Sequence, residues 1–268
     1  MRPGISICVL ARDEGGKIAS ALASARACGW CDELLVVDTG STDDTAAIAE
    51  QTADRVEHHA WVDFGTNRKR MVEAASHDWV FVLDADEQIT PALSAEIEGL
   101  PDAAFELHPI MEMPRRNYLL GRFVRAWQPD QVSRLMDRRR VDWPARSVHD
   151  VRELREGSVG RLAGAITHNA GFDEWTDYFD GDRYGRRTEA LGREMYEQGR
   201  RVGFWGMLFR PWAAFVKFYW LKGGFLDGTF GLMIAQKAAL SVQLRYARLW
   251  HLQQRGGDGP GGHESSGS

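Results

Sequence analysis

Residues 78–87 read DWVFVLDADE, and this stretch decides the fold. The apolar residues 79–83 predict a buried strand, because a short continuous apolar run that ends in charges is typical of a strand covered on both faces. Acidic residues follow at positions 84, 86 and 87. An apolar strand that ends in carboxylates is typical of the ligand-binding edge of an α/β sheet, because ligands lie beyond the carboxyl ends of the strands.

The same pattern occurs twice upstream. Residues 5–10 are apolar and are followed by Ala-Arg-Asp-Glu at positions 11–14. Residues 34–37 are apolar and end at Asp38, with Thr-Gly-Ser-Thr-Asp behind it. Because the carboxyl ends of parallel strands meet at one edge of a sheet, we expect the three polar clusters to converge on one cleft.

Helical patterns separate these strands. Helices are expected over residues 15–27 and 64–75. A third helix is expected to begin at an N-cap formed by Ser41, with Asp44 three residues later, and a fourth at Pro91, directly after Thr90. A short third strand is expected at residues 55–58. Strands that alternate with helices predict an α/β fold, with a mainly parallel sheet flanked by helices. From about Pro101 the periodicity weakens, and this middle part is expected to carry loops and the acceptor side.

Asp84 and Asp86 stand at positions i and i+2, so one loop can aim both carboxylates at a single hard cation. Mg²⁺ or Mn²⁺ would fill the rest of its shell with phosphate oxygens and neutralise a diphosphate leaving group. The alternative is a solvated acidic turn, which is the commoner meaning of an isolated Asp-x-Asp. The position after an apolar strand favours the metal. Glu87 is either a further ligand or a helix-start residue.

Asp38 can accept the imide N–H of a uracil base, and Gly40 allows the chain to turn sharply behind it. The alternative is that Asp38 and Ser41 only form a turn and cap a helix. Further along the chain, His149, Asp150 and His168 are candidates for a general base and for a further metal ligand. Asp150 could serve as the general base, and His149 or His168 as a metal ligand. A surface His-Asp pair is the alternative.

Residues 172–254 are helical in pattern and rich in aromatic residues. Between residues 200 and 255 there are nine Lys and Arg but one acid, a net charge of +8 in a chain of net charge −5. One face is expected to carry Trp212, Phe215, Val216, Tyr219 and Trp220. A basic, aromatic helix fits an anionic membrane interface, whereas packing on the domain or a homodimer contact is the alternative.

The overall composition limits the choice of partners and compartment. The net charge of −5 gives no reason to expect nucleic acid. Three cysteines fit a reducing compartment, and no apolar run reaches the roughly 18 residues that a membrane span needs. These observations favour a cytoplasmic protein that is peripheral at the inner face of the cell membrane.

Residues 32–45, DELLVVDTGSTDDT, and residues 78–87 resemble the family 2 glycosyltransferases, which have the GT-A fold. Within that family the chain is similar to the lipopolysaccharide-core β-glucosyltransferase branch, and the resemblance continues at SVHD (147–150) and GGFLDG (223–228). It implies a metal-dependent transfer of a hexose from a UDP-sugar to a glycan or glycolipid, with inversion at the anomeric carbon. The process would be cell-envelope lipopolysaccharide or polysaccharide synthesis.

The resemblance also implies site roles. Ala11, Glu14 and Asp38 would hold the uridine, Asp84 and Asp86 would face the ribose and the metal diphosphate, and Asp150 would be the base. Asp86 would be the firmer metal ligand, together with His149 or His168. There are two departures from the branch: Asp13 stands where an Asn is usual, and Asp150 stands where a Glu is usual.

The expected organisation has three parts. Residues 1–170 would form the GT-A catalytic domain, with a donor half (1–100) and an acceptor half (101–170). Residues 171–255 would form a helical extension, and residues 256–268 a disordered tail. Two competing functions are a nucleotidyltransferase with the same kind of sheet and a non-catalytic membrane-surface protein that keeps the fold. The first would need a basic glycine-rich loop after the first strand, and the second does not explain the Asp84/Asp86 pair.

Overall fold

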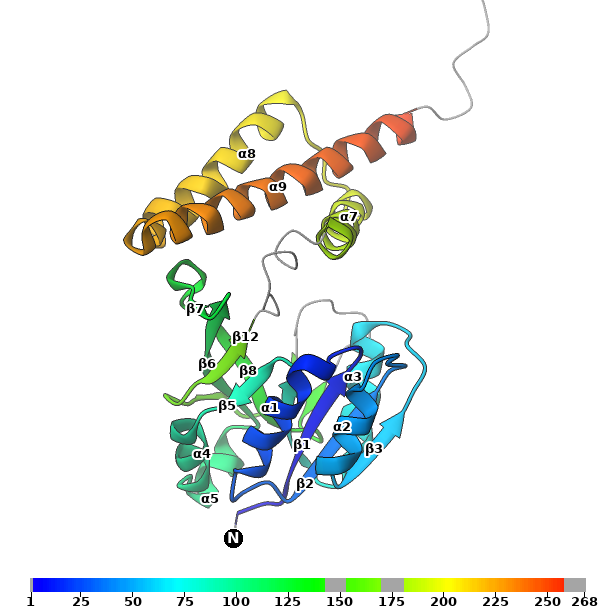
Figure 1. Ribbon diagram of the computed structural model, residues 1–268, viewed down its shortest axis with the longest axis vertical. Coiled ribbons are helices and arrows are strands. Elements are labelled where there is room, and N and C mark those ends of the chain that lie inside the picture. Colours follow the sequence, from blue (N-terminus) through cyan, green and yellow to red (C-terminus); the bar gives the residue numbers. More distant parts are fainter. Residues whose placement is uncertain (1, 143–152, 170–180, 258–268) are drawn as a thin grey trace, which may run out of the picture. The chain divides into compact units, whose positions relative to one another are not determined.

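The computed structural model describes residues 2–142, 153–169 and 181–257 of the chain. Contacts divide the chain into two units (Figure 1). Unit 1 comprises residues 1–123 and 129–171, and unit 2 comprises residues 124–128 and 172–268. The predicted disordered tail, residues 256–268, lies outside the described residues from position 258 onward.

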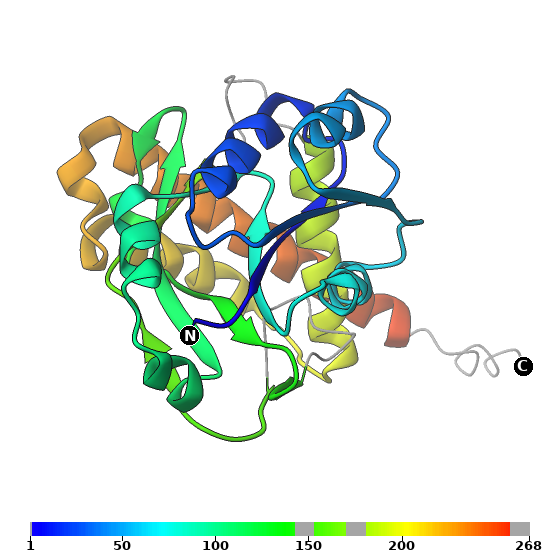
Figure 2. The same cartoon turned by 90° about the horizontal axis from the view of Figure 1, so that it is seen from below.

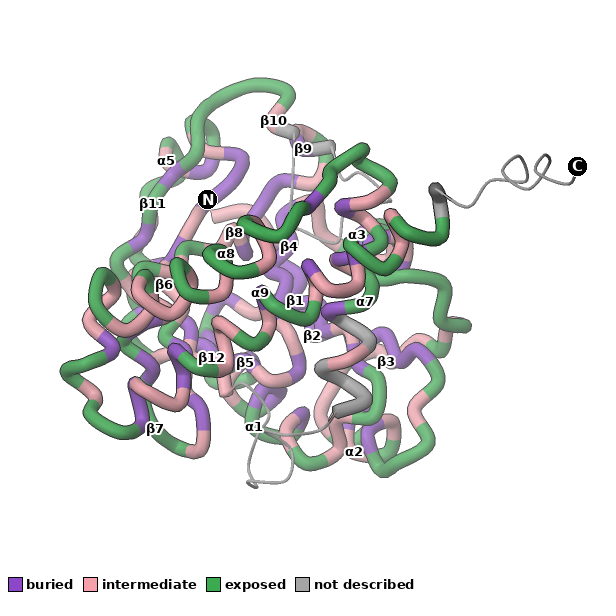
Figure 3. Tube along the Cα trace, turned by 90° about the horizontal axis from the view of Figure 1, so that it is seen from above, coloured by how far each residue is buried: buried purple, intermediate pink, exposed green. Residues whose placement is uncertain are grey.

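Unit 1 is built around a ten-stranded sheet, and the first four strands of the chain form its parallel part. They lie in the order β3-β2-β1-β4 and are β1 (Ile5–Ala11), β2 (Glu33–Asp38), β3 (Arg55–His58) and β4 (Trp79–Asp84). β1, β2 and β4 are apolar because both of their faces are buried, and every residue of β2 is buried; β3, at the edge of the sheet, is only half-buried. Figure 3 shows β1, β2 and β4 as largely buried segments.

Helices cover both faces of this sheet, as the α/β prediction requires. They are α1 (Gly15–Arg26), α2 (Thr45–Thr52), α3 (Phe64–Ala74), α4 (Pro91–Glu98) and α5 (Asp102–Leu107). Side chains of α1, α2, α4 and α5 share one core with alternate residues of β1 and β2. Met71 and Val72 of α3 share a second core with the intervening residues, such as Cys8 and Leu35. The predicted fold class is therefore confirmed (Figure 2).

The acceptor half continues the same sheet, which differs from the loops expected there. Its strands are β6 (Ile110–Leu119), β7 (Arg122–Phe123), β8 (Gln131–Asp137), β11 (Val159–Arg161) and β12 (Ile166–Asn169), and they are joined by β5 (Glu87–Ile89) from the end of the donor half. β8 is antiparallel to β4 and β6, and β12 joins β6 to β5. A separate two-stranded pair consists of β9 (Val141–Asp142) and β10 (Glu153–Leu154).

One predicted helix start is wrong. α2 begins at Thr45 with Asp44 at the N-cap position, not at a Ser41 cap. The hydroxyl of Ser41 instead donates to the carboxylate of Asp38, which keeps residues 39–43 in a loop. By contrast, α4 begins as predicted, because the Oγ1 of Thr90 accepts a hydrogen bond from the N–H of Leu93 ahead of Pro91.

Unit 2 is helical, as expected of the C-terminal extension. It contains η1 (Arg125–Trp127), α7 (Gly181–Glu197), α8 (Phe204–Val216), η2 (Lys217–Leu221), η3 (Gly224–Asp227) and α9 (Gly228–Gly257). Figure 1 shows α8 and α9 side by side. The chain turns sharply from α8 into α9 through η3. Glycine is needed at position 231 of α9, because a Cβ there would lie 1.7 Å from the carbonyl oxygen of Gly224 in η3. Among the described residues, no helix combines the length and the apolarity that crossing a bilayer requires.

Candidate active site

Asp84, the last residue of β4, is held by two arginines. Arg68 of α3 pairs with its Oδ1, and Nη2 of Arg134 on β8 lies 2.6 Å from its Oδ2. Burial alone would raise the pKa of Asp84, but the positive charges of Arg134 and Arg68 outweigh it and hold this pKa well below its usual range. Asp84 is therefore ionised at neutral pH.

Glu87 is a buried partner of the same arginines. Its Oε1 lies 2.5 Å from Nη2 of Arg134 and 3.3 Å from Nη1 of Arg115, and its Oε2 accepts a hydrogen bond from the N–H of Asp84 at 3.2 Å. Burial and the negative charge of the neighbouring Asp84 raise the pKa of Glu87 overall, although the positive charges of Arg134 and Arg115 act to lower it. Its predicted role as a helix-start residue is wrong, because Glu87 lies on β5 and α4 begins four residues later.

Asp86 and His168 lie together, although 82 positions separate them in the sequence. β12 pairs with β5 so that His168 is opposite Glu87, which brings Nε2 of His168 to 3.4 Å from Oδ2 of Asp86. The other ring nitrogen, Nδ1, lies 2.6 Å from Oδ1 of Asn117 on β6. The amide of Asn117 in turn donates from Nδ2 to Oδ2 of Asp130 at 2.8 Å, and Arg115 also donates to that carboxylate.

The remaining predicted metal and base residues, His149 and Asp150, lie outside the described residues. Within the described part of the chain, no group of three His, Cys, Asp or Glu side chains is arranged to hold a metal ion. Asp86 and His168 are thus a pair of potential protein ligands. A divalent cation that also binds a diphosphate needs few protein ligands, because phosphate and water oxygens fill the remaining positions.

Asp38 ends β2 beside Ala11 of β1 and forms a tight turn. Its carboxylate accepts hydrogen bonds from the N–H groups of Gly40 and Ser41 and from the Ser41 hydroxyl, and Nδ1 of His58 lies 3.5 Å away. Burial raises the pKa of Asp38, but these hydrogen bonds outweigh it and lower the pKa overall. The turn that the alternative interpretation predicted is present, and the carboxylate is almost fully buried.

The loop after β1 is tied to the loop after β2. The N–H of Asp13 donates to Oγ of Ser41 at 3.0 Å, and the N–H of Thr42 donates back to Oδ1 of Asp13 at 2.7 Å. Asp13 has a φ of 52°, a left-handed conformation that Asp and Asn tolerate better than other side chains. This left-handed conformation accounts for an Asp at position 13, where the glycosyltransferase branch that the sequence resembles usually has Asn.

The two other predicted uridine residues have defined places in these loops. The carbonyl of Ala11 accepts two hydrogen bonds from Thr39, at 3.0 Å from N and 3.1 Å from Oγ1. Glu14 precedes α1 and pairs with Lys17 at 3.0 Å. Ala11, Glu14, Asp38 and Asp84 all lie at the carboxyl edge of β1, β2 and β4, so the predicted clusters share one edge of the sheet.

Three further residues at this edge were missed by the sequence analysis: Arg68, Arg115 and Arg134. Arginines at unremarkable spacings on a helix and two strands carry no signal until the pairing of the strands is known. Asn67 of α3 is 1% exposed, and neither Nδ2 nor Oδ1 of its amide has a hydrogen-bond partner in the described structure.

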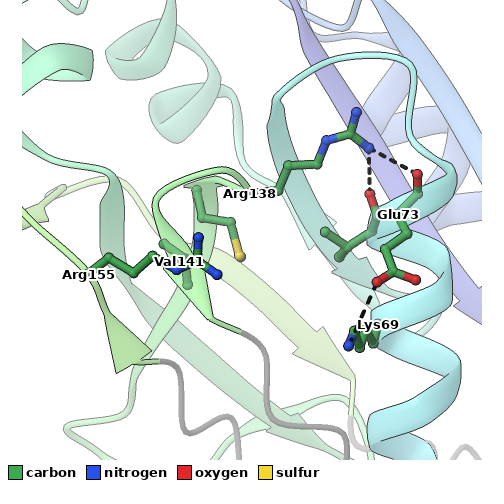
Figure 4. Close-up of a pocket in the computed structure, with 7 residues that line it drawn as sticks. Lys69, Glu73, Arg138, Val141 and Arg155 are labelled. Atoms are coloured by element: carbon green, nitrogen blue, oxygen red, sulfur yellow. Dashed lines mark hydrogen bonds and ion pairs between the residues drawn. The ribbon is translucent and has the colours of Figure 1, made fainter.

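A separate hollow of about 240 Å³ lies between α3, β8 and the β9–β10 pair (Figure 4). Its lining includes Lys69, Arg138 and Arg155. Nη1 of Arg138 donates to the carbonyls of Val72, Glu73 and Ala75 at 2.8–3.0 Å, so this guanidinium caps the end of α3. Arg138 directly follows β8, beyond Asp137, which is opposite Trp79 at the amino end of β4. The hollow is therefore not part of the carboxyl-edge site.

The sequence of this site region matches a known family. Residues 6–149, more than half of the chain, match the family described as Glycosyl transferase family 2. The chain belongs to this family. The match covers β1 to β9 and therefore the loops that carry Asp38, Asp84 and Asp86.

Two curated relatives match this chain over very different shares of their own lengths. A TPR repeat-containing protein of Synechococcus elongatus is 42% identical over 86 residues, which are 32% of this chain and 21% of that protein. The chain thus spans about a fifth of the length of that relative. The lipopolysaccharide core biosynthesis glycosyltransferase LpsC of Rhizobium meliloti is 26% identical over 232 residues, which are 82% of this chain and 83% of LpsC.

Among solved structures, the chain is similar to glucosyl-3-phosphoglycerate synthase from Mycobacterium tuberculosis, crystallised with Mn²⁺, UDP and glucosyl-3-phosphoglycerate. The TM-score is 0.35 and the sequence identity is 25%, over 43% of this chain and 44% of that one.

Proposed function

We propose that this family 2 member is an inverting, metal-dependent glycosyltransferase that moves a hexose from a UDP-sugar to a glycan or glycolipid acceptor. The observation that carries the proposal is the contact between Asp86 and His168 at the end of β4. The similarity to LpsC along most of both chains supports an acceptor from cell-envelope lipopolysaccharide or polysaccharide synthesis.

The hydrogen bonds around His168 argue for a cation between its ring and Asp86. Asn117 uses its NH₂ group on Asp130, so its carbonyl oxygen faces His168 and can only accept. Nδ1 of His168 must therefore carry the proton, and in the neutral ring Nε2 presents a lone pair to the Asp86 carboxylate. Two electron-rich groups 3.4 Å apart repel each other unless a proton or a metal ion lies between them, and we propose the metal ion because it would also bind the diphosphate of the donor.

Mg²⁺ or Mn²⁺ fits this donor set. Neighbouring ligands in an octahedral shell with bonds of about 2.1 Å lie roughly 3 Å apart, close to the observed separation. A second-shell acceptor on Nδ1 orients a metal-binding imidazole, and Asn117 occupies that position. Asp86 and His168 would hold the ion, with His149 as a further candidate ligand. When bound, the ion would supply Lewis-acid stabilisation of the diphosphate leaving group.

The other roles follow the layout of the carboxyl edge. Ala11, Glu14 and Asp38 would bind the uridine, and Asp84 would face the ribose, with Arg68 and Arg134 fixing its carboxylate. To bind the uracil, the carboxylate of Asp38 would have to accept a hydrogen bond with a lone pair that is not already engaged by the hydrogen bonds of its own turn. Asp150 remains our candidate for the general base that takes the proton of the acceptor hydroxyl. The catalytic domain would be residues 1–170.

The test is metal-dependent binding of UDP, measured by calorimetry. We expect the parent to bind UDP more tightly with Mn²⁺ than with EDTA, whereas Asp86→Ala and His168→Ala should lose this difference. His251→Ala, on exposed surface of α9, is the matched control and should behave as the parent. Metal-dependent UDP binding by Asp86→Ala that equals the parent's would contradict the metal assignment. NMR of the product from an α-linked donor would then test inversion, since a β-linkage is expected.

We also propose that unit 2 binds an anionic membrane surface, which would make the enzyme peripheral at the inner face of the membrane. The outward face of α8 supports this, with five large apolar residues more than half exposed: Phe204, Trp205, Leu208, Phe209 and Trp212. The opposite face packs into unit 2 through Met207 and Ala214. The face predicted from the sequence is only partly exposed: Trp212 and Trp220 are exposed, whereas Phe215, Val216 and Tyr219 are half-buried.

The positive charge of unit 2 favours an anionic membrane over other apolar partners for this face. The segment from residue 200 to 255 carries +8, and its one acid, Asp227, is paired with Arg125 at 3.4 Å. Basic residues beside an exposed aromatic face are typical of helices that lie in an anionic lipid interface. A homodimer formed through α8 is the competing occupant of the same face.

A further inference from the structure

Four side chains near the carboxyl edge of unit 1 form a strip in which two neighbouring aromatic rings lie between two cations. The guanidinium carbon of Arg12 lies 5.4 Å from the ring centre of Trp61, and Trp61 meets Phe64 at 6.2 Å with their planes 70° apart. The guanidinium carbon of Arg68 lies 4.8 Å from the ring centre of Phe64, and Arg68 pairs with Asp84. Each cation lies within the distance at which a ring attracts it.

The strip crosses the edge of the sheet at a particular strand. Arg12 directly follows β1, and Trp61 stands three residues beyond the end of β3. β2 lies between β1 and β3 in the sheet, and Asp38 is its last residue. The contact between Arg12 and Trp61 therefore joins the two loops on either side of the strand end that carries Asp38.

Both rings of the strip are partly open to solvent, with Trp61 41% and Phe64 46% exposed. They cannot be explained as core residues. Phe64 is held in place because it begins α3, which Asp63 caps by accepting from the N–H of Thr66 at 2.8 Å. Trp61 in turn contacts Phe64 and Arg12. A positioned aromatic surface loses little conformational freedom when a ligand stacks on it.

We propose that Trp61, together with Arg12, forms the stacking surface for the nucleoside base of the donor. This inference rests on the proposed use of a nucleoside-diphosphate sugar and adds the residues that recognise its base. A planar heterocycle has two π-faces, and indole and guanidinium groups both stack on such faces. A base is favoured over a sugar ring because Arg12 and Trp61 flank the end of β2, at the opposite end of the strip from the Arg68–Asp84 pair.

The experiment compares two ligands that differ in the base. Binding of UDP and of inorganic pyrophosphate, both with Mn²⁺, is measured by calorimetry for the parent, Trp61→Ala and Trp61→Phe. Loss of one stacking partner corresponds to roughly 5- to 100-fold weaker binding. We expect a loss in this range for UDP with Trp61→Ala, unchanged pyrophosphate binding, and recovery of most UDP affinity in Trp61→Phe. Trp250→Ala, at an exposed tryptophan of α9, is the control and should bind both ligands normally.

Three results would overturn the inference. UDP binding by Trp61→Ala that equals the parent's would show that the ring does not stack on the base. An equal loss for UDP and pyrophosphate would mean that Trp61 only supports the loop. Normal UDP binding with a raised KM for the acceptor would assign Trp61 to the acceptor. If the parent itself binds no uridine nucleotide, the proposed function fails, and the comparison between variants separates the two cases.

Discussion

At the scale of single residues, Glu33 illustrates how one carboxylate joins several segments. It is buried at the start of β2 and accepts hydrogen bonds from the Ser6 hydroxyl on β1 and from N and Oγ of Ser76, both at 2.7 Å. Arg55 of β3 lies 3.2 Å from its Oε1. Burial raises the pKa of Glu33, but these partners outweigh it and lower the pKa overall.

We expect Glu33→Gln to reduce the free energy of unfolding at pH 7 by about 1–3 kcal/mol, because charge-assisted hydrogen bonds become neutral ones. A lowered folded-state pKa stabilises the protein above the unfolded value, near 4.5, and this stabilisation is lost as the pH falls through the folded value. The advantage of the parent over Glu33→Gln should therefore shrink below about pH 4.5 in urea denaturation experiments. Glu106→Gln, at an exposed position, is the control. A pH-independent difference would contradict this account.

At the scale of elements, the apolar strands of the donor half were predictable and those of the acceptor half were not. β1, β2 and β4 consist of short apolar runs because both faces of these strands are buried. β6 and β8 instead carry buried polar residues whose partners lie outside these two strands, such as Asn117 with Asp130 and Arg134 with Glu87 of β5. Periodicity cannot reveal such strands, because the partner of each polar side chain comes from a distant segment.

The same reason limits prediction of the site. Asp38, Asp84 and Asp86 follow apolar runs and were found from the sequence. His168 was one of several candidates, and only the pairing of β12 with β5 shows which carboxylate it contacts. Arg134 and Arg68 were not candidates at all. Local patterns thus predict candidate ligands at strand ends, whereas the side chains that orient these candidates depend on tertiary contacts.

The outward face of α8 gives a prediction for a whole element. Trp205→Gln/Phe209→Gln/Trp212→Gln should reduce sedimentation with anionic vesicles by at least about 100-fold in partition coefficient, since burial of each ring contributes roughly 1.5–3 kcal/mol. Binding of the parent should require anionic lipid and weaken as salt is added. The matched control is Leu240→Gln/Leu244→Gln/Trp250→Gln, three exposed apolar positions of α9, which should sediment as the parent does.

Two outcomes would decide against the membrane for α8. Equal sedimentation of the parent and the α8 variant, or none by either, would exclude this face as the lipid contact. Light scattering of the parent as a dimer that the α8 variant converts to a monomer would assign the face to a second subunit instead.

At the scale of the whole molecule, charge is divided unevenly along the chain. The segment from residue 200 to 255 carries +8 and the whole chain −5, so the remainder carries −13. Such a division orients a protein near a charged surface before any contact forms. The acidic remainder contains the whole described carboxyl edge, where positive charge comes from Arg68, Arg115 and Arg134.

The amide of Asn67 has a consequence for the folding equilibrium of the molecule. A buried amide with no hydrogen-bond partner in the described structure lowers stability by about 1–3 kcal/mol compared with an apolar group of similar size. We expect Asn67→Leu to raise the thermal midpoint by about 2–12 °C in calorimetry, since each kcal/mol corresponds to roughly 2–4 °C in a chain of this size. Asn117→Leu should lower it, because that amide is bonded to both Asp130 and His168. A lower midpoint for Asn67→Leu would show that its amide is already satisfied. The native protein thus holds a latent reserve of thermostability at one helical position, which engineering could recover.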